Sequence, residues 1–226
     1  LPGFRYHYPS HHPSAQRGTN YDVTQPVIDE LRGKLAVVRS FTAPTQENCA
    51  AMEREFGRYM VLIRDVRDIV VSLFHHARAH PRSVFVDQGI ERQLPWTPLP
   101  KDALELDDER CLDLVIENML PGLASLSLDW FEYQREQDHV LLLRYEDVIQ
   151  NTADELSRIL VHYDLDIPRP SIETVVAKLA PTSGEFKFRK GVAGNWKNEL
   201  TVRQQRRCQE IAGDFLERAG YAETSG

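Results

Sequence analysis

The stretch YMVLIRDVRDIVVSLFHH, residues 59–76, decides how we expect this chain to fold. It begins with a short apolar run, 59–63, which has the length of a buried strand and is too short for most helices. The polar residues 64–68 follow, and apolar residues then return at helical spacing from Ile69 to Phe74. A strand, a charged turn and a helix make half of a βα unit. Such turns lie at the carboxyl ends of parallel strands, where open α/β folds bind their ligands.

Two arginines and a serine in this stretch could hold an anion. Arg64 lies just past the expected strand, Arg67 follows three residues later, and Ser72 lies on the expected helix. An arginine can bind a phosphate through two parallel hydrogen bonds, and a hydroxyl can donate one more. The alternative is that the arginines pair with Asp65 and Asp68 and that Ser72 is an ordinary helix residue. Taken alone, this stretch favours the alternative.

Length and composition describe an ordinary globular chain. Its 226 residues, 42% hydrophobic and 27% charged, predict a single α/β domain over residues 1–226. A net charge of −7 argues against a general nucleic-acid binder. No apolar run approaches membrane-spanning length and no signal peptide is visible, so we expect no membrane span. Cys49, Cys111 and Cys208 lie far apart without metal-ligand spacing, which predicts free thiols, no metal site and a reducing, cytoplasmic location.

Two segments lack regular periodicity. Residues 1–26 are rich in Pro, His, Tyr, Ser and Gly, and we expect an irregular segment packed on the rest of the domain. His7, His11 and His12 lie close together there, but no carboxylate or cysteine stands at ligand spacing, so we expect no zinc site. Residues 81–101 contain four prolines and predict a long surface loop, of the kind that often serves as a lid or binds a substrate.

Hydrophobic periodicity and capping residues place the other elements. We expect a strand at 35–38 and helices at 24–33, 45–57, from Arg67 to about 80, 107–136 and 201–219. Pro121-Gly122 should divide 107–136 into two helices. The order strand, helix, strand predicts that the strands at 35–38 and 59–63 form a parallel pair with a right-handed crossover.

A second informative stretch is HVLLLRYEDVIQNTADELSRILVHYDLDI, residues 139–167. Its continuous apolar run from Val140 to Leu143 is typical of a buried parallel strand. Tyr145 follows at the carboxyl end of this strand, and Asn151 could begin the next helix. The ring of Tyr145 could stack on an adenine, since every base offers a π-face, or it could simply seal the end of the sheet. The residues support both readings equally.

A third stretch, FKFRKGVAGNWKNELT at residues 186–201, is basic in an acidic protein. Gly191 and Gly194 would let the backbone approach an anion closely, and Trp196 supplies an aromatic plane. The alternative is an exposed basic loop that precedes the last helix.

The three stretches, in this order, resemble motifs of the sulfotransferase family. The first resembles the family's 3′-phosphate-binding motif, with Arg64, Arg67-Asp68 and Ser72 at the family spacing. The second resembles the strand that ends in Y-E-D, whose tyrosine lies against the adenine in the family. Residues 189–197, RKGVAGNWK, match the signature R-K-G-x-x-G-[DN]-W-K throughout. The resemblance spans roughly residues 35–221.

This resemblance implies a three-layer α/β fold with a central parallel sheet, related to the P-loop kinases. It implies 3′-phosphoadenosine 5′-phosphosulfate (PAPS) as donor, adenosine 3′,5′-bisphosphate as product, and an unidentified small-molecule or carrier-bound acceptor with a hydroxyl or amine. The residues that it implies for nucleotide binding are Arg64, Ser72, Tyr145, Arg189, Lys190 and Gly191. We expect these residues to converge on one pocket.

Two departures from the family pattern bear on activity. No strand followed by P-K-S-G-T-like residues occurs, so the strand, loop and helix that cradle the 5′-phosphosulfate are missing or rebuilt. The family's catalytic histidine usually stands in K-[ST]-H, and the matching residues here are Arg39-Ser40-Phe41. Phe41 cannot accept a proton, which leaves the catalytic residues unassigned. Other bases, among His75, His76 or the N-terminal histidines, find no support in their spacing.

Three functions remain open at this point. The first is a PAPS-dependent sulfotransferase. The second is a catalytically impaired domain of the same fold that binds the bisphosphate or a partner, and the departures predict that this chain binds the bisphosphate better than it transfers sulfate. The third is a P-loop nucleotide kinase, which the absence of a Walker A motif weakens.

Overall fold

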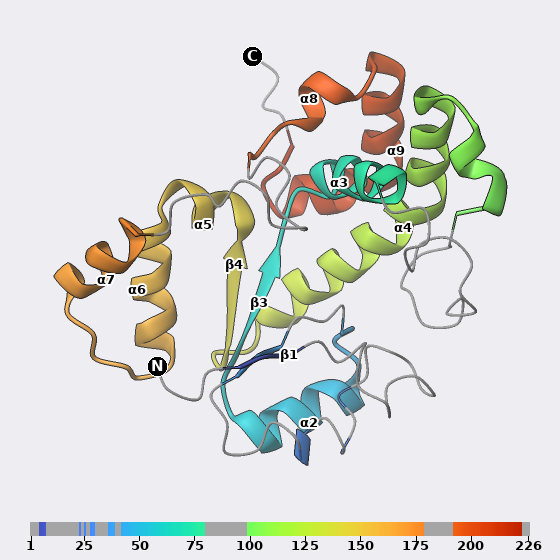
Figure 1. Cartoon of the computed structure of the whole chain (residues 1–226). Helices are drawn as coiled ribbons and strands as arrows, with labels where there is room; N and C mark the ends of the chain where they lie inside the picture. Colours follow the sequence, from blue (N-terminus) through green and yellow to red (C-terminus); the bar gives the residue numbers. More distant parts are fainter. Residues whose placement is uncertain are drawn as a thin grey trace.

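The computed structural model of the chain (Figure 1) describes residues 5–7, 23, 25, 28–29, 36–38, 42–79, 99–178 and 192–222. Predictions for most of 1–26, for Arg39-Ser40-Phe41, for 81–98 and for Arg189-Lys190-Gly191 lie outside these residues. Within them, parallel strands and packed helices form an α/β fold, as the sequence predicts.

The strands that position the site are β3 (Tyr59–Ile63) and β4 (Val140–Arg144). They pair in parallel, from Tyr59 opposite Val140 to Ile63 opposite Arg144. Both strands were predicted from the sequence, from the apolar runs at 59–63 and 140–143, and the structure confirms them. Because the two strands are parallel and in register, their carboxyl ends lie side by side at one edge of the sheet.

A second pair of strands corrects two predictions. β1 (Arg5–His7) pairs in parallel with β2 (Ala36–Val38). β3 pairs with β4 and not with β2 among the described strands, so the predicted pairing of the strand at 35–38 with that at 59–63 is wrong. Strand–helix–strand order permits a parallel pair but does not select neighbours in the sheet. The prediction that 1–26 is irregular is wrong at 5–7, where three residues are too few to show a strand period.

The helices agree with most of the predicted ranges. They are α2 (Gln46–Phe56), α3 (Val66–Ala79), α4 (Asp108–Gln134), α5 (Tyr145–Gln150), α6 (Thr152–His162), α7 (Arg169–Val176), α8 (Trp196–Glu199) and α9 (Val202–Arg218), with a 3₁₀ helix at Lys101–Glu105. Thr45 caps α2, which ends at Gly57 with φ 70°. Thr201 and Gln204 form a capping box at the start of α9.

α4 corrects the prediction of two helices. It is one helix of 27 residues with Pro121 inside it, and Figure 1 shows that it bends along its length. A proline removes one backbone hydrogen bond and kinks a helix. Here Pro121 is exposed while Leu120 and Leu123 are buried on either side, so core packing keeps the two halves in one helix.

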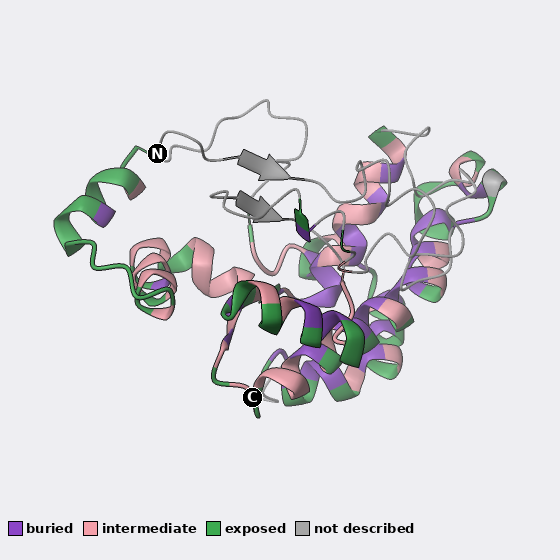
Figure 2. Ribbon diagram, turned by 90° about the horizontal axis from the view of Figure 1, so that it is seen from below, coloured by how far each residue is buried: buried purple, intermediate pink, exposed green. Residues whose placement is uncertain are grey.

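The main core lies where α3, α4 and α9 pack together. Figure 2 shows buried residues concentrated in this region, whereas α7 is almost entirely exposed. Among the described residues, α4 is also the one helix long and apolar enough to cross a membrane. Half of its most apolar window is buried inside the fold, as expected for the core helix of a globular domain.

Candidate functional site

Arg64 and Tyr145 meet at the carboxyl ends of the two central strands. Arg64 directly follows Ile63, the last residue of β3, and Tyr145 directly follows Arg144, the last residue of β4. Ile63 and Arg144 lie opposite each other in the sheet. The guanidinium carbon of Arg64 lies 4.3 Å from the centroid of the Tyr145 ring, in a cation–π contact. Both residues are partly exposed, so neither is enclosed in the core.

The guanidinium of Arg64 is only loosely held. Its Nη2 lies 3.4 Å from the Val192 carbonyl oxygen and 3.6 Å from Asp68 Oδ2. Charge-assisted hydrogen bonds between these groups are normally about 2.7–2.9 Å long. Its Nε is buried and has no hydrogen-bond partner among the described residues. An anion placed beside this guanidinium would find donors that the protein does not satisfy.

Arg67 has the opposite environment. Its side chain donates to both carboxylate oxygens of Asp65, with Nη2 2.7 Å from Oδ2, and to the carbonyl oxygen of Tyr221 at 2.7 Å. Its guanidinium carbon lies 3.7 Å from the ring centroid of Trp196. For Arg67 the pairing with a neighbouring aspartate is thus the correct reading, and its role is to hold the fold together.

Asp68 attaches the third stretch to the first. Its carboxylate is fully buried and accepts hydrogen bonds from the backbone N–H groups of Gly194, at 2.7 Å, and Trp196, at 2.9 Å. Gly194 has φ 75°, a conformation that favours glycine. These bonds bring the residues that directly follow 189–191 against Arg64. Arg189, Lys190 and Gly191 themselves lie outside the described residues.

Glu146 connects the second stretch to the first and to the end of α9. One carboxylate oxygen accepts from the backbone N–H of Asp65 at 3.0 Å, and the other accepts from the Tyr221 hydroxyl at 2.8 Å. Sequence reasoning assigned no role to Glu146 or Tyr221, and for Asp68 it offered only pairing with an arginine. The signals available were the adjacency of Glu146 to Tyr145 and of Asp68 to Arg67.

Ser72 lies one helical turn beyond Asp68 on α3, so the two residues share a face of the helix. Ser72 is half-buried, and its hydroxyl makes no hydrogen bond with any residue that the structure describes. His75, by contrast, is paired with Glu199, whose other oxygen accepts from the Asn195 side chain. Across the described ranges, no group of three histidine, cysteine or carboxylate side chains is arranged to hold a metal ion.

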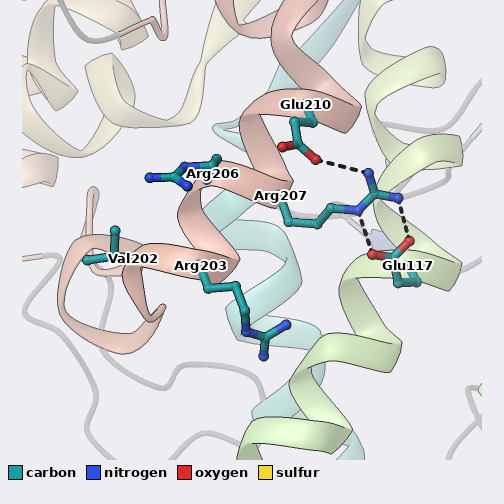
Figure 3. Close-up of a pocket in the computed structure, with 6 residues that line it drawn as sticks. All are labelled: Glu117, Val202, Arg203, Arg206, Arg207 and Glu210. Atoms are coloured by element: carbon teal, nitrogen blue, oxygen red, sulfur yellow. Dashed lines mark hydrogen bonds and ion pairs between the residues drawn. The ribbon is translucent and has the colours of Figure 1, made fainter.

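A groove of about 390 Å³ lies elsewhere, between α4 and α9. Figure 3 shows its lining, which is Glu117, Val202, Arg203, Arg206, Arg207 and Glu210. Arg207 donates to both oxygens of Glu117, at 2.6 and 2.8 Å, and to Glu210 at 3.1 Å. Carboxylates thus already satisfy the central arginine of this groove, which joins two helices and is distinct from the site at Arg64.

Comparison with known proteins identifies relatives over most of the chain. A family model described as "Sulfotransferase domain" matches residues 44–220. The chain is 26% identical over 168 residues to sulfotransferase 2B1 of Mus musculus, an alignment that covers 62% of this chain and 42% of that protein. It is 29% identical over 121 residues to sulfotransferase 1 family member D1 of Mus musculus, covering 42% of this chain and 41% of that protein. The chain thus aligns with about two fifths of the length of these relatives.

Solved structures with a similar fold include mouse sulfotransferase SULT7A1 complexed with PAP. That structure superposes with a TM-score of 0.62 at 15% identity and covers 97% of this chain and 76% of its own. Retinol dehydratase in complex with androsterone and inactive cofactor PAP gives a TM-score of 0.58 at 18% identity, covering 82% of this chain and 54% of its own. At these identities the similarity shows the fold alone.

Proposed function

Because this chain belongs to the sulfotransferase domain family, we propose that the site at the carboxyl ends of β3 and β4 binds the adenosine 3′,5′-bisphosphate part of PAPS. The protein that contains this domain would then transfer the sulfuryl group of PAPS to a hydroxyl or amine of an acceptor. The acceptor is a small molecule or a group on a carrier, and loops such as 81–101 would select it.

The loosely held guanidinium of Arg64, stacked on Tyr145, carries the proposal. Arg64 covers one face of the tyrosine ring, and an adenine would stack on the other face. The 3′-phosphate would accept hydrogen bonds from the guanidinium and from Ser72, with Arg189, Lys190 and the backbone of Gly191 as further donors.

A second candidate is a domain that binds the nucleotide without turnover. Its support is the residue at position 41: phenylalanine, which cannot accept a proton, stands where the family resemblance places a histidine. General-base catalysis contributes about a hundred- to ten-thousand-fold in rate, so its loss would leave binding intact and turnover weak. For either candidate we propose a reducing, cytoplasmic location, in keeping with three buried free cysteines at positions 49, 111 and 208.

The test of nucleotide binding is titration calorimetry with adenosine 3′,5′-bisphosphate. Arg64→Ala should weaken binding by roughly 10- to 100-fold, because a charge-assisted hydrogen bond contributes about 1.5–3 kcal/mol. Arg64→Lys should recover only part of this, since lysine keeps the charge but loses the paired donors. The matched control is Arg206→Ala, because Arg206 is exposed on α9 and Figure 3 shows it pointing away from its neighbours.

The two candidates separate in a transfer assay with ³⁵S-labelled PAPS. Binding of the bisphosphate together with sulfate transfer supports the enzyme, and binding without transfer supports the binding domain. If Arg64→Ala binds the bisphosphate as tightly as the wild type, the proposed site is wrong for both candidates.

A further inference from the structure

The carboxylate of Glu146 joins three distant parts of the chain. Its Oε1 accepts from the Asp65 N–H, which is 81 residues away in sequence, and its Oε2 accepts from the Tyr221 hydroxyl, 75 residues away. Both carboxylate oxygens are therefore used, in one case by a turn that follows β3 and in the other by the segment that follows α9.

The bond from the Asp65 N–H lies next to the Arg64–Tyr145 contact. The Asp65 N–H belongs to the peptide group that links Arg64 to Asp65, so the bond fixes the backbone at Arg64. Glu146 is itself the residue after Tyr145. The pairing of β3 and β4 ends at Ile63 and Arg144. Beyond that point the Glu146 carboxylate, on α5, accepts a hydrogen bond from the backbone that follows β3 and so links the two chain segments. The 4.3 Å contact between guanidinium and ring is thus built on it.

Tyr221 holds the Glu146 carboxylate in place through its hydroxyl. Its side chain is buried, its carbonyl oxygen accepts from Arg67, and the guanidinium carbon of Arg144 lies 4.1 Å from its ring centroid. Burial, and then the neighbouring carboxylate of Glu146, raise the pKa of Tyr221 well above its usual value. The hydroxyl is therefore protonated, and able to donate, at neutral pH.

We propose that Glu146, backed by Tyr221, is a positioning residue that holds Arg64 against Tyr145 and so sets the preference of this site for nucleotides that carry a 3′-phosphate. The inference rests on the proposed function of the site. In this proposal Glu146 acts through its two hydrogen bonds, to the Asp65 N–H and from the Tyr221 hydroxyl, and not by binding the nucleotide. Its effect would pass through Arg64, the residue proposed to meet the phosphate.

The experiment compares two probes that differ only in the 3′-phosphate. Calorimetry would give the affinities for adenosine 3′,5′-bisphosphate and adenosine 5′-monophosphate, and their ratio measures the preference. Glu146→Ala should lower the ratio about tenfold, the equivalent of one charge-assisted hydrogen bond at the phosphate, while the monophosphate affinity changes little. Glu146→Gln should restore most of the preference, because its amide can accept from the Asp65 N–H and donate to the Tyr221 hydroxyl. The control is Asp147→Ala, the neighbouring carboxylate on α5.

Tyr221→Phe provides a second route if Glu146→Ala fails to fold. It removes the hydroxyl and keeps the ring beneath Arg144, so we expect a fall in the ratio of about threefold. A ratio that stays at the wild-type value in Tyr221→Phe and in folded Glu146→Ala overturns the inference. An equal loss of affinity for both probes also overturns it, because it would show that Glu146 only stabilises the fold and does not act on the 3′-phosphate preference. If the wild type itself shows no preference for the 3′-phosphate, the proposed function fails instead.

Discussion

At the scale of residues, Arg64 and Arg67 differ in what surrounds them and not in chemistry. The Arg67 side chain is 5% exposed, and its guanidinium is engaged by Asp65, by a backbone carbonyl and by the Trp196 ring. Arg64 is 24% exposed and touches its polar neighbours only at 3.4–3.6 Å. A saturated arginine stabilises the fold, whereas an unsaturated one remains available to a ligand.

This contrast predicts that the same substitution costs much more stability at Arg67 than at Arg64. Arg67→Ala should lower the free energy of unfolding by about 3–5 kcal/mol, because it leaves the buried Asp65 carboxylate unpaired. Arg64→Ala should lower it by about 1 kcal/mol or less while weakening nucleotide binding. Urea unfolding of both variants measures the difference. Equal losses of stability would show that Arg64 is as structural as Arg67.

The local sequence pattern could not separate the two arginines, although the family resemblance assigned only Arg64 to the nucleotide. Both lie next to an aspartate, and the local pattern favoured pairing for each. What saturates Arg67 is a carbonyl 154 residues further along the chain, which no local pattern reveals. The same limit explains why Glu146 and Tyr221 had no predicted role. Arg64 and Tyr145, in contrast, could be predicted to meet, because each follows an apolar run typical of a parallel strand.

At the scale of elements, α4 remains one helix because its packing in the core outweighs the tendency of Pro121 to end a helix. Pro121 cannot donate to the carbonyl of Glu117, but both residues lie on the exposed face, where water can satisfy that carbonyl. The buried face is continuous through Leu120 and Leu123. The sequence predicted a break because proline is a strong local signal, and the signal that opposes it is tertiary. The β1–β2 pairing escaped prediction for the related reason that partner choice is non-local.

Pro121→Ala should therefore stabilise the protein. The alanine restores one backbone hydrogen bond and removes the ring clash, which costs about 3 kcal/mol in a regular helix. Part of this gain is offset because α4 has already bent and because proline restricts the unfolded chain. We expect a net increase of about 1–2 kcal/mol in the free energy of unfolding by chemical denaturation. A decrease would mean that the bend itself is needed for packing against α3 and α9.

At the scale of the whole molecule, α9 connects the end of the chain to the main core. It packs on α4 through the core and is joined to it at the surface by Arg203, which pairs with Glu109 and Asp113, and by Arg207, which pairs with Glu117. The hydrogen bonds from Arg207 lower the pKa of Glu117 below its ordinary value of 4.5. A carboxylate whose pKa is lower in the folded state stabilises that state above its ordinary pKa, and this contribution is lost as pH falls through the folded value.

Glu117→Gln should make stability less sensitive to acid. Between pH 7 and about pH 3.5 the wild type should lose more free energy of unfolding than the variant, since only the wild type takes up a proton at Glu117 on unfolding. The effect should be small because the pair is exposed. Glu217→Gln, on the outer face of α9, is the control and should behave like the wild type. Identical acid profiles for wild type and Glu117→Gln would show that this pair contributes nothing to pH dependence.

The bond from Arg67 to the Tyr221 carbonyl also orders events during synthesis. A nascent chain leaves the ribosome with Arg64, Arg67 and, later, Tyr145 exposed long before Tyr221 has been added. Until then Arg67 lacks its carbonyl acceptor and Glu146 lacks its hydroxyl donor. The strand ends can meet co-translationally, but their final arrangement must wait until translation has passed Tyr221. A chain that stops between residues 192 and 220 would carry every residue proposed to bind the nucleotide but would lack the two hydrogen bonds that Tyr221 makes with Arg67 and Glu146.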